Sequence, residues 1–220
     1  SGLYPLKLPI GLGLEGAGVI TDVGDNVKDF KVGDKISYAG IPLGSYSSHR
    51  NYPTKNLVKV PDGIDLEIAA TLMTKGLTTF YLLHKTYPVK SGETILFHAA
   101  AGGVGISAVQ LAKNYGAKVI AAVGSDEKKE FINKFTPDLV INYQKENLKE
   151  IVEQKFGRRP VDIFYDQVGG EMYESGIKLL KSEGKALIVG FASGNIPSQL
   201  LSYLLVKNIT VMGVFMIDFE

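Results

Sequence analysis

Residues 94–113 have the sequence TILFHAAAGGVGISAVQLAK, the strongest fold signal in this chain. The stretch begins with an apolar run typical of a buried β-strand, turns through small residues, and continues with the apolar spacing of a helix. A helix that opens directly after such a turn presents unpaired backbone amides and the positive end of its dipole to an anion. The order of strand, glycine turn and helix therefore predicts a phosphate-binding loop.

The glycines of this loop have separate expected roles. Gly102 lets the backbone approach a pyrophosphate, and Gly105 lets the helix pack against the strand. Ala100 stands where the fingerprint Gly-x-Gly-x-x-Gly has its first glycine. A glycine-rich turn without a ligand is the alternative, but the repeated strand–helix setting favours a bound dinucleotide.

The second part of the chain repeats this rhythm of short apolar runs and helical segments. The expected strands are residues 94–99, 118–123, 139–142, 162–166, 185–189 and 209–214. The expected helices between them are residues 105–115, 126–135, 145–156, 171–181 and 198–205. Two earlier helices are expected over residues 65–72, with Asp65 as N-cap, and 74–87. This alternation predicts an α/β fold, a doubly wound parallel sheet of the Rossmann type.

The first 70 residues have a different character. Residues 17–24 and 32–38 are β-rich, and one or two more strands are expected within residues 46–59. Residues 11–16, GLGLEG, match the glycine fingerprint in full, but a β-rich run follows them instead of a helix, so no phosphate binding is expected there. We therefore expect a small β domain over residues 1–70 and a Rossmann-type domain over residues 71–220.

The composition excludes several classes of function. The 220 residues include 24 Lys and Arg, 23 Asp and Glu, and no cysteine. The absence of cysteine excludes disulfides, thiolate catalysis, iron–sulfur clusters and sulfur-ligated zinc. The net charge of +1 gives no reason to expect nucleic acid as a partner. No apolar run approaches the roughly 18 residues that a membrane-spanning helix needs.

The end of the second Rossmann strand indicates which dinucleotide would bind. NAD sites usually place a carboxylate there for the ribose 2′-hydroxyl, whereas this strand ends in Gly124-Ser125. Ser125 and Lys128 could bind a 2′-phosphate instead, which favours NADP(H). Asp126 could serve the ribose, although capping of the next helix together with Ser125 is the favoured interpretation. Lys128 and Lys129 could equally form a solvated face.

Several motifs together resemble one known family. They are Gly2-Leu3-Tyr4-Pro5, GLEGAG at 13–18, Val32-Gly33-Asp34, Lys75-Gly76-Leu77-Thr78, the loop 99–105, YDQVG at 165–169 and Val189-Gly190. In this order they resemble the zinc-free, zeta-crystallin-like quinone oxidoreductases of the medium-chain dehydrogenase/reductase superfamily. The resemblance implies a partial GroES-like β domain, a Rossmann-type domain and an NADPH site in the cleft between them. It also implies that the chain is truncated at both ends.

The same resemblance implies a set of cofactor-binding residues. At the pyrophosphate, it places Gly103, Val104 and Gly105. At the adenosine 2′-phosphate, it places Gly124, Ser125 and Lys128, with Tyr143 covering the ribose. Beside the ribose and nicotinamide, it places Val168, Val189, Gly190 and Phe191, with Thr78 and Tyr81 on the nicotinamide side.

No metal is expected in this chain. In the zinc-dependent relatives, a metal-binding histidine directly precedes the glutamate that corresponds to Glu15, and here that position is Leu14. His49, His84 and His98 are scattered and lack metal-ligand spacing. His98 is expected to be a packed, hydrogen-bonded imidazole.

The resemblance implies an NADPH-dependent quinone oxidoreductase that transfers reducing equivalents from NADPH to a quinone without zinc. No catalytic residue is assigned. Tyr4 and Tyr46 are candidates for the substrate pocket, with a half-buried strand position as the alternative for Tyr46. A 2-alkenal or enone reductase and a non-catalytic, crystallin-like NADPH-binding protein are alternative functions. A homodimer through residues 209–214 and a cytoplasmic location are further expectations.

Overall fold

A computed structural model describes residues 7–198 and 201–215. The chain forms two compact units, residues 1–77 and 78–220. The boundary falls inside helix α1 (Leu66–Phe80). Tyr4 of the expected substrate pocket and the motif Gly2-Leu3-Tyr4-Pro5 lie outside the described residues.

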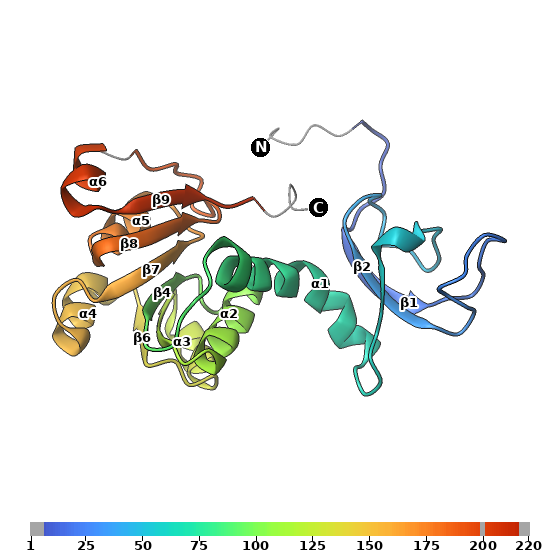
Figure 1. Ribbon diagram of the computed structural model, residues 1–220, viewed down its shortest axis with the longest axis horizontal. Coiled ribbons are helices and arrows are strands. Elements are labelled where there is room, and N and C mark those ends of the chain that lie inside the picture. Colours follow the sequence, from blue (N-terminus) through green and yellow to red (C-terminus); the bar gives the residue numbers. More distant parts are fainter. Residues whose placement is uncertain (1–6, 199–200, 216–220) are drawn as a thin grey trace. The chain divides into compact units, whose positions relative to one another are not determined.

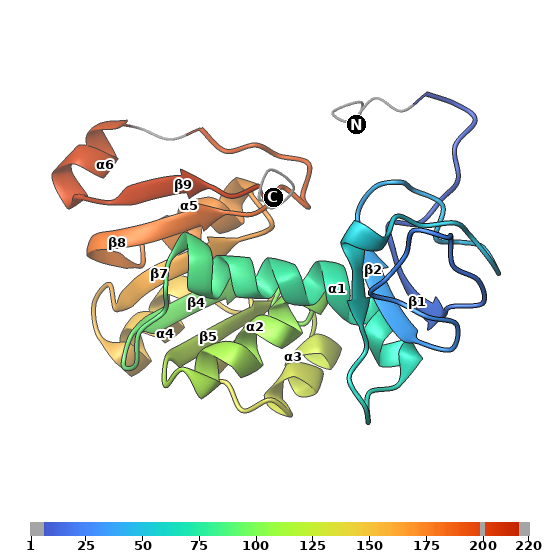
Figure 2. The same cartoon turned by 45° about the vertical axis from the view of Figure 1, so that its right-hand side comes forward.

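The second unit is built on a six-stranded parallel sheet (Figures 1 and 2). Its strands are β4 (Thr94–His98), β5 (Lys118–Val123), β6 (Leu139–Asn142), β7 (Val161–Asp166), β8 (Leu180–Ile188) and β9 (Thr210–Gly213). They lie in the order β6-β5-β4-β7-β8-β9, so the order reverses between β4 and β7. Open sheets of this type bind ligands at the carboxyl ends of the strands beside such a reversal. The predicted doubly wound fold is confirmed.

Helices cover both faces of this sheet. They are α2 (Gly103–Asn114), α3 (Asp126–Asn133), α4 (Leu148–Phe156), α5 (Gly170–Ile177) and α6 (Leu201–Lys207). Alternate strand residues point to opposite faces, so Ile95 and Phe97 pack with α2 in one core while Leu96 packs with α4 and α5 in the other. Both faces are therefore sealed, as the apolar strand runs require.

Three of these helices have a boundary that differs from the expectation by at least three residues. α5 ends at Ile177 because buried Leu180 already belongs to β8, which makes that strand longer than residues 185–189. α4 begins at Leu148 instead of 145 because the Asn147 side chain accepts a hydrogen bond from the Glu150 amide and caps the helix there. α6 spans Leu201–Lys207, later than the expected 198–205, of which residues 199–200 lie outside the description.

The two helices expected at 65–72 and 74–87 form one helix and a wider turn. α1 runs without a break from Leu66 to Phe80, and a π-helical segment, Tyr81–Thr86, follows it. The Leu82 and Leu83 side chains of this segment are fully buried against the sheet. The segment therefore anchors the start of the second unit.

The first unit contains a small antiparallel sheet of β1 (Glu15–Val19), β2 (Lys35–Ala39) and β3 (Leu57–Lys59). Only the last part of the stretch 46–59 is a strand, because a short 3-10 turn at Thr54–Asn56 follows Pro53, which has no amide for a ladder. The Ser37 hydroxyl donates to the Gly16 and Ala69 carbonyls and so ties the sheet to α1.

Among residues 7–198 and 201–215, the helices are all too short or too polar to cross a lipid bilayer.

Candidate functional site

The loops that follow the parallel strands meet at one edge of the sheet. In a parallel sheet all carboxyl ends lie on the same side, so the segments after His98, Val123, Asn142, Asp166 and Ile188 share that edge. Most of the site residues expected from the sequence lie in these segments.

The glycine loop after β4 has the geometry of an anion-binding turn. Ala99 adopts a positive φ of 51°, and the Gly102 amide donates to its carbonyl at 2.8 Å. Gly102 is the N-cap of α2, and a Cβ there would lie 3.1 Å from the Ala99 carbonyl oxygen. Gly103, Val104 and Gly105 form the first turn, where amides have no intrahelical acceptor. Three such amides and the positive end of the helix dipole therefore lie at the same end of α2.

Gly105 is required by close packing. A Cβ atom built there would lie 2.4 Å from the Ala100 carbonyl oxygen, a contact that side chains do not make. The role expected for Gly105, close packing of the helix on the strand and loop, therefore agrees with the structure. By contrast, the fingerprint at residues 11–16 runs into strand β1 and opens no helix, as expected.

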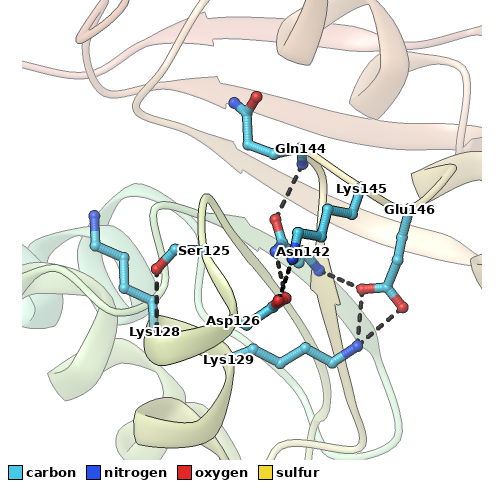
Figure 3. A network of polar contacts seen from close by, with 8 residues as sticks. All are labelled: Ser125, Asp126, Lys128, Lys129, Asn142, Gln144, Lys145 and Glu146. Atoms are coloured by element: carbon cyan, nitrogen blue, oxygen red, sulfur yellow. Dashed lines mark hydrogen bonds and ion pairs between the residues drawn. The ribbon is translucent and has the colours of Figure 1, made fainter.

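The ends of β5 and β6 come together, as the family resemblance implied. A Cβ on Gly124 would lie 2.9 Å from the Tyr143 hydroxyl, so this phenol rests against the glycine backbone. Ser125 caps α3, and its hydroxyl accepts a hydrogen bond from the Lys128 amide at 3.2 Å. The Lys128 side chain is exposed and extends away from the neighbouring polar network (Figure 3).

Asp126 is held by a polar network from the loop after β6 (Figure 3). One carboxylate oxygen accepts from Asn142 Nδ2 at 2.6 Å, and the other accepts from Lys145 Nζ at 2.5 Å. The Lys145 ammonium lowers the pKa of the Asp126 carboxyl. Helix capping was the favoured interpretation for Asp126, but Ser125 supplies the cap, and the Asp126 side chain bonds to Asn142 and Lys145.

Lys129 belongs to the same network and differs from Lys128. Its ammonium bonds both oxygens of Glu146, at 2.9 and 2.8 Å, and Glu146 also accepts from the Asn142 amide. Lys128 and Lys129 therefore do not form one solvated face, because Lys129 is committed to the loop after β6.

A buried pair joins the loops on either side of the point where the strand order reverses. His98 Nδ1 lies 3.1 Å from Asp166 Oδ1, and both side chains are fully buried. Asp166 also accepts from the Val168 and Gly169 amides, and Gln167 Nε2 donates to the His98 carbonyl at 3.2 Å. The expectation of a packed, hydrogen-bonded His98 is confirmed.

The segment after β8 packs beside the segment after β7. The Val189 and Gly190 amides both donate to the Asp166 carbonyl, and the Val168 carbonyl accepts from Ser193. Phe191 remains 41% exposed beside them. Val168, Val189, Gly190 and Phe191 are thus brought into one backbone platform at the carboxyl edge.

Thr78 and Tyr81 lie at the start of the second unit, on either side of Thr79. The Thr79 hydroxyl donates to the Val104 carbonyl at 3.2 Å, so this segment touches the first turn of α2. Tyr46 lies elsewhere, in a loop of the first unit. It is 83% exposed, and the half-buried strand position considered for it is wrong.

Sequence reasoning missed Lys145, Glu146 and Asp166. Their side chains act through partners 19, 17 and 68 residues away, namely Asp126, Lys129 and His98. Asp166 carried a usable signal, because it is a charged residue at the end of an apolar strand. The other two carried none, because lysine and glutamate are ordinary in a surface loop.

The fold and the glycine loop define a dinucleotide-binding domain of the Rossmann type. Residues 103–220 match the family of zinc-binding dehydrogenases, and residues 1–62 match the alcohol dehydrogenase GroES-like domain. A quinone oxidoreductase of Salmonella typhimurium is 45% identical over 93% of this chain and 63% of the relative. A 2-haloacrylate reductase of a Burkholderia species is 41% identical over 84% of this chain and 56% of the relative.

The solved structures agree. Escherichia coli quinone oxidoreductase complexed with NADPH is 41% identical and superposes with a TM-score of 0.90, covering 98% of this chain and 67% of that one. The chain belongs to the quinone oxidoreductase family of the medium-chain dehydrogenase/reductase superfamily. It spans less than two thirds of the length of the curated relatives named above.

The Lys129–Glu146 pair gives a testable pKa. The Lys129 ammonium and the Asn142 amide hold the pKa of Glu146 below its ordinary value of 4.5. Carboxyl NMR titration should show this pKa rise toward 4.5 in Lys129→Met. Because the folded-state pKa is lowered, the pair stabilises the fold above the unfolded pKa, and this stabilisation is lost as pH falls through the folded value. The same pKa in wild type and variant would contradict the pairing.

Proposed function

We propose that this chain is the larger part of an NADPH-dependent quinone oxidoreductase that works without zinc. The observation that carries the proposal is the glycine loop between β4 and α2, which leaves the first-turn amides of α2 without an intrahelical acceptor. In this proposal, residues 1–70 form the GroES-like part and residues 71–220 form the NADPH-binding part. When bound, the nicotinamide would supply the hydride, and the protein supplies binding and orientation.

The glycine loop fits a pyrophosphate. Gly103, Val104 and Gly105 offer amides in the first helical turn, and Gly102 has no side chain to block the approach. Amides in fixed directions bind an anion without reorganising, so the phosphates would set the position of the whole dinucleotide.

The end of β5 favours a 2′-phosphate over a free 2′-hydroxyl. Within the described residues, the Lys128 ammonium pairs with no carboxylate, and Ser125 and Tyr143 offer hydroxyl groups near Gly124. The nearest carboxylate, Asp126, is bonded to Lys145 and Asn142, so it repels a phosphate less than a free carboxylate would. The relative from Escherichia coli was solved with NADPH, which supports the same choice.

The platform after β7 and β8 suits the ribose and nicotinamide. Val168, Val189 and Gly190 are fixed by hydrogen bonds to the Asp166 strand end and to Ser193. The half-exposed ring of Phe191 and the side chains of Val168 and Val189 offer an apolar surface that would exclude water from a flat ring. Thr78 and Tyr81 would complete the nicotinamide side of the site.

Zinc independence rests on the sequence. The chain has no cysteine, and Leu14 stands where zinc-dependent relatives carry the metal-binding histidine. Within the described residues, His, Asp and Glu side chains do not gather into a group of three that could hold a metal. A quinone becomes a stable anion on reduction and can take protons from water, so the reaction needs no Lewis acid from the protein.

Reduction of an activated alkene is the second candidate. It is favoured by the 2-haloacrylate reductase relative, whose name describes an electron-poor carbon–carbon double bond as substrate. A hydride donor held flat against an apolar platform serves both acceptors.

We also propose a homodimer joined through residues 209–214. β9 is an edge strand of the six-stranded sheet, and its outer side leaves backbone groups unpaired within the described part of the chain. Pairing of two such edges would satisfy these groups.

The activity assay uses the full-length protein that contains this chain. Oxidation of NADPH is followed with benzoquinone, phenanthrenequinone and a 2-alkenal in turn, with and without EDTA. Turnover of a quinone that EDTA leaves unchanged is expected. Turnover of the alkenal alone would select the second candidate, and loss of turnover in EDTA would contradict zinc independence.

Gly102→Val should abolish binding of both NADPH and NADH. The dihedral angles of Gly102, φ −80° and ψ 169°, are allowed for valine, but its Cβ would lie 3.1 Å from the Ala99 carbonyl oxygen and the side chain would crowd the loop at the start of α2. Fluorescence titration measures the binding, and circular dichroism checks the fold. Unchanged affinity in a folded variant would place the pyrophosphate elsewhere.

Lys128→Ala should weaken NADPH about tenfold and leave NADH unchanged, because a charge-assisted bond to the 2′-phosphate is lost. Lys134→Ala is the matched control, since this lysine lies at the other end of α3 and should change neither affinity. Equal losses for NADPH and NADH in Lys128→Ala would refute the assignment.

A further inference from the structure

A basic pocket lies at the opposite end of the six-stranded sheet from the candidate cofactor site. The cavity has a volume of about 360 Å³ and is lined by Arg158, Arg159, Lys181, Ser182 and Lys207. Arg158 and Arg159 lie in the turn before β7, Lys181 and Ser182 lie in the first residues of β8, and Lys207 ends α6, shortly before β9. All three strands begin at this end, away from the arrowheads in Figure 2.

The charges of the pocket are incompletely balanced. Lys181 pairs with Asp162, whose other oxygen accepts from the Thr94 amide. Within residues 7–198 and 201–215, no carboxylate pairs with Arg158, Arg159 or Lys207. These three cations therefore line the pocket without a direct ion pair, although the Glu153 carboxylate attracts Arg158 from outside the pocket lining.

Two other carboxylates, Glu153 and Glu183, lie close to the pocket residues in the sequence. Glu153 bonds the Lys149 ammonium at 2.6 Å and accepts from the Arg159 backbone amide at 3.3 Å. Glu183 follows Ser182 but does not line the cavity. The pocket lining itself contains no acidic side chain.

The Arg159 guanidinium gives the strongest indication of a ligand. Its Nε and Nη2 atoms are buried and have no hydrogen-bond acceptor in the described structure. Buried donors are almost always satisfied in native proteins, and a charged one has the most to gain from an acceptor. Nε and one Nη form the edge of the guanidinium that binds two oxygens of one anion.

The C-terminal ends of two helices explain only part of this basic cluster. α4 and α6 both end at this pocket, and basic residues near a helix C-terminus interact with its unpaired carbonyls. That effect accounts for cations near Phe156 and Asn208, but it gives the two Arg159 nitrogens no acceptor. Arg159, Glu183 and Asn208 each adopt a positive φ, which non-glycine residues adopt at a cost in free energy.

We propose that this pocket binds the phosphate group of a small phosphorylated molecule. A planar guanidinium and a serine hydroxyl match tetrahedral oxygens, and three cations without an ion-pair partner match more than one negative charge. Because the pocket is open to solvent, the rest of such a molecule can extend outward. The proposal does not depend on the activity proposed for the opposite edge of the sheet.

The test is an NMR titration of the isotope-labelled protein with pyrophosphate at low salt. Saturable shifts are expected at the amides of Arg158, Arg159, Ser182 and Lys207. Shifts confined to residues 102–105 would place the phosphate in the glycine loop alone and overturn the proposal. Equal shifts with succinate would overturn the preference for phosphate, and tighter binding of a single-stranded oligonucleotide would point to nucleic acid instead.

Variants separate binding from structural support. Arg159→Gln should weaken pyrophosphate about tenfold, because a charge-assisted bond is lost. Lys178→Ala, an exposed lysine outside the pocket, should bind as the wild type does. If Arg159→Gln does not fold, Lys207→Gln should show the same loss of pyrophosphate affinity. Wild-type affinity in the folded variant, or a pyrophosphate-induced rise in Tm that is equal in variant and wild type, would overturn the proposal.

Discussion

The contact between Gly105 and Ala100 is the constraint on which the rest of the structure depends. The backbone of α2 lies so close to the turn after β4 that even one methyl group at Gly105 would collide with the Ala100 carbonyl. This approach fixes the axis of α2, and with it the direction of the first-turn amides. It also allows Ala108, Val109 and Ala112 to pack directly onto the central strands. Binding geometry and core packing therefore share one origin.

The buried His98–Asp166 pair extends that constraint across the central strands. β4 and β7 are neighbours in space, and the residues of this pair are 68 positions apart in the chain. Asp166 holds the amides of the following loop while it contacts the imidazole, so the loops on both sides of the strand reversal are fixed together. Burying a polar pair costs free energy unless its hydrogen bonds are formed. Here His98 Nδ1 and both Asp166 carboxylate oxygens have partners. The position of the platform after β8 follows from the same strand end.

The sequence predicted the parallel sheet, its helices and the glycine loop because each depends on local periodicity and on turn residues. The resemblance to quinone oxidoreductases was also confirmed. The sequence did not predict the hydrogen bonds between Lys129 and Glu146, because they depend on how β5 and β6 align. Of the one or two strands expected within residues 46–59, only β3 forms, at the end of the stretch after Pro53. The early end of α5 was missed because Leu179 and Leu180 suit a helix and a buried strand equally well.

The Asp126–Lys145 pair has one more consequence under the proposed function. Both side chains are largely solvent-exposed, at 62% and 68%. Attraction across such a pair is screened by dissolved ions, as is attraction between Lys128 and any phosphate. The preference for coenzyme with a 2′-phosphate over coenzyme without it therefore depends on the ionic strength of the medium as well as on the protein. It is greatest at low ionic strength.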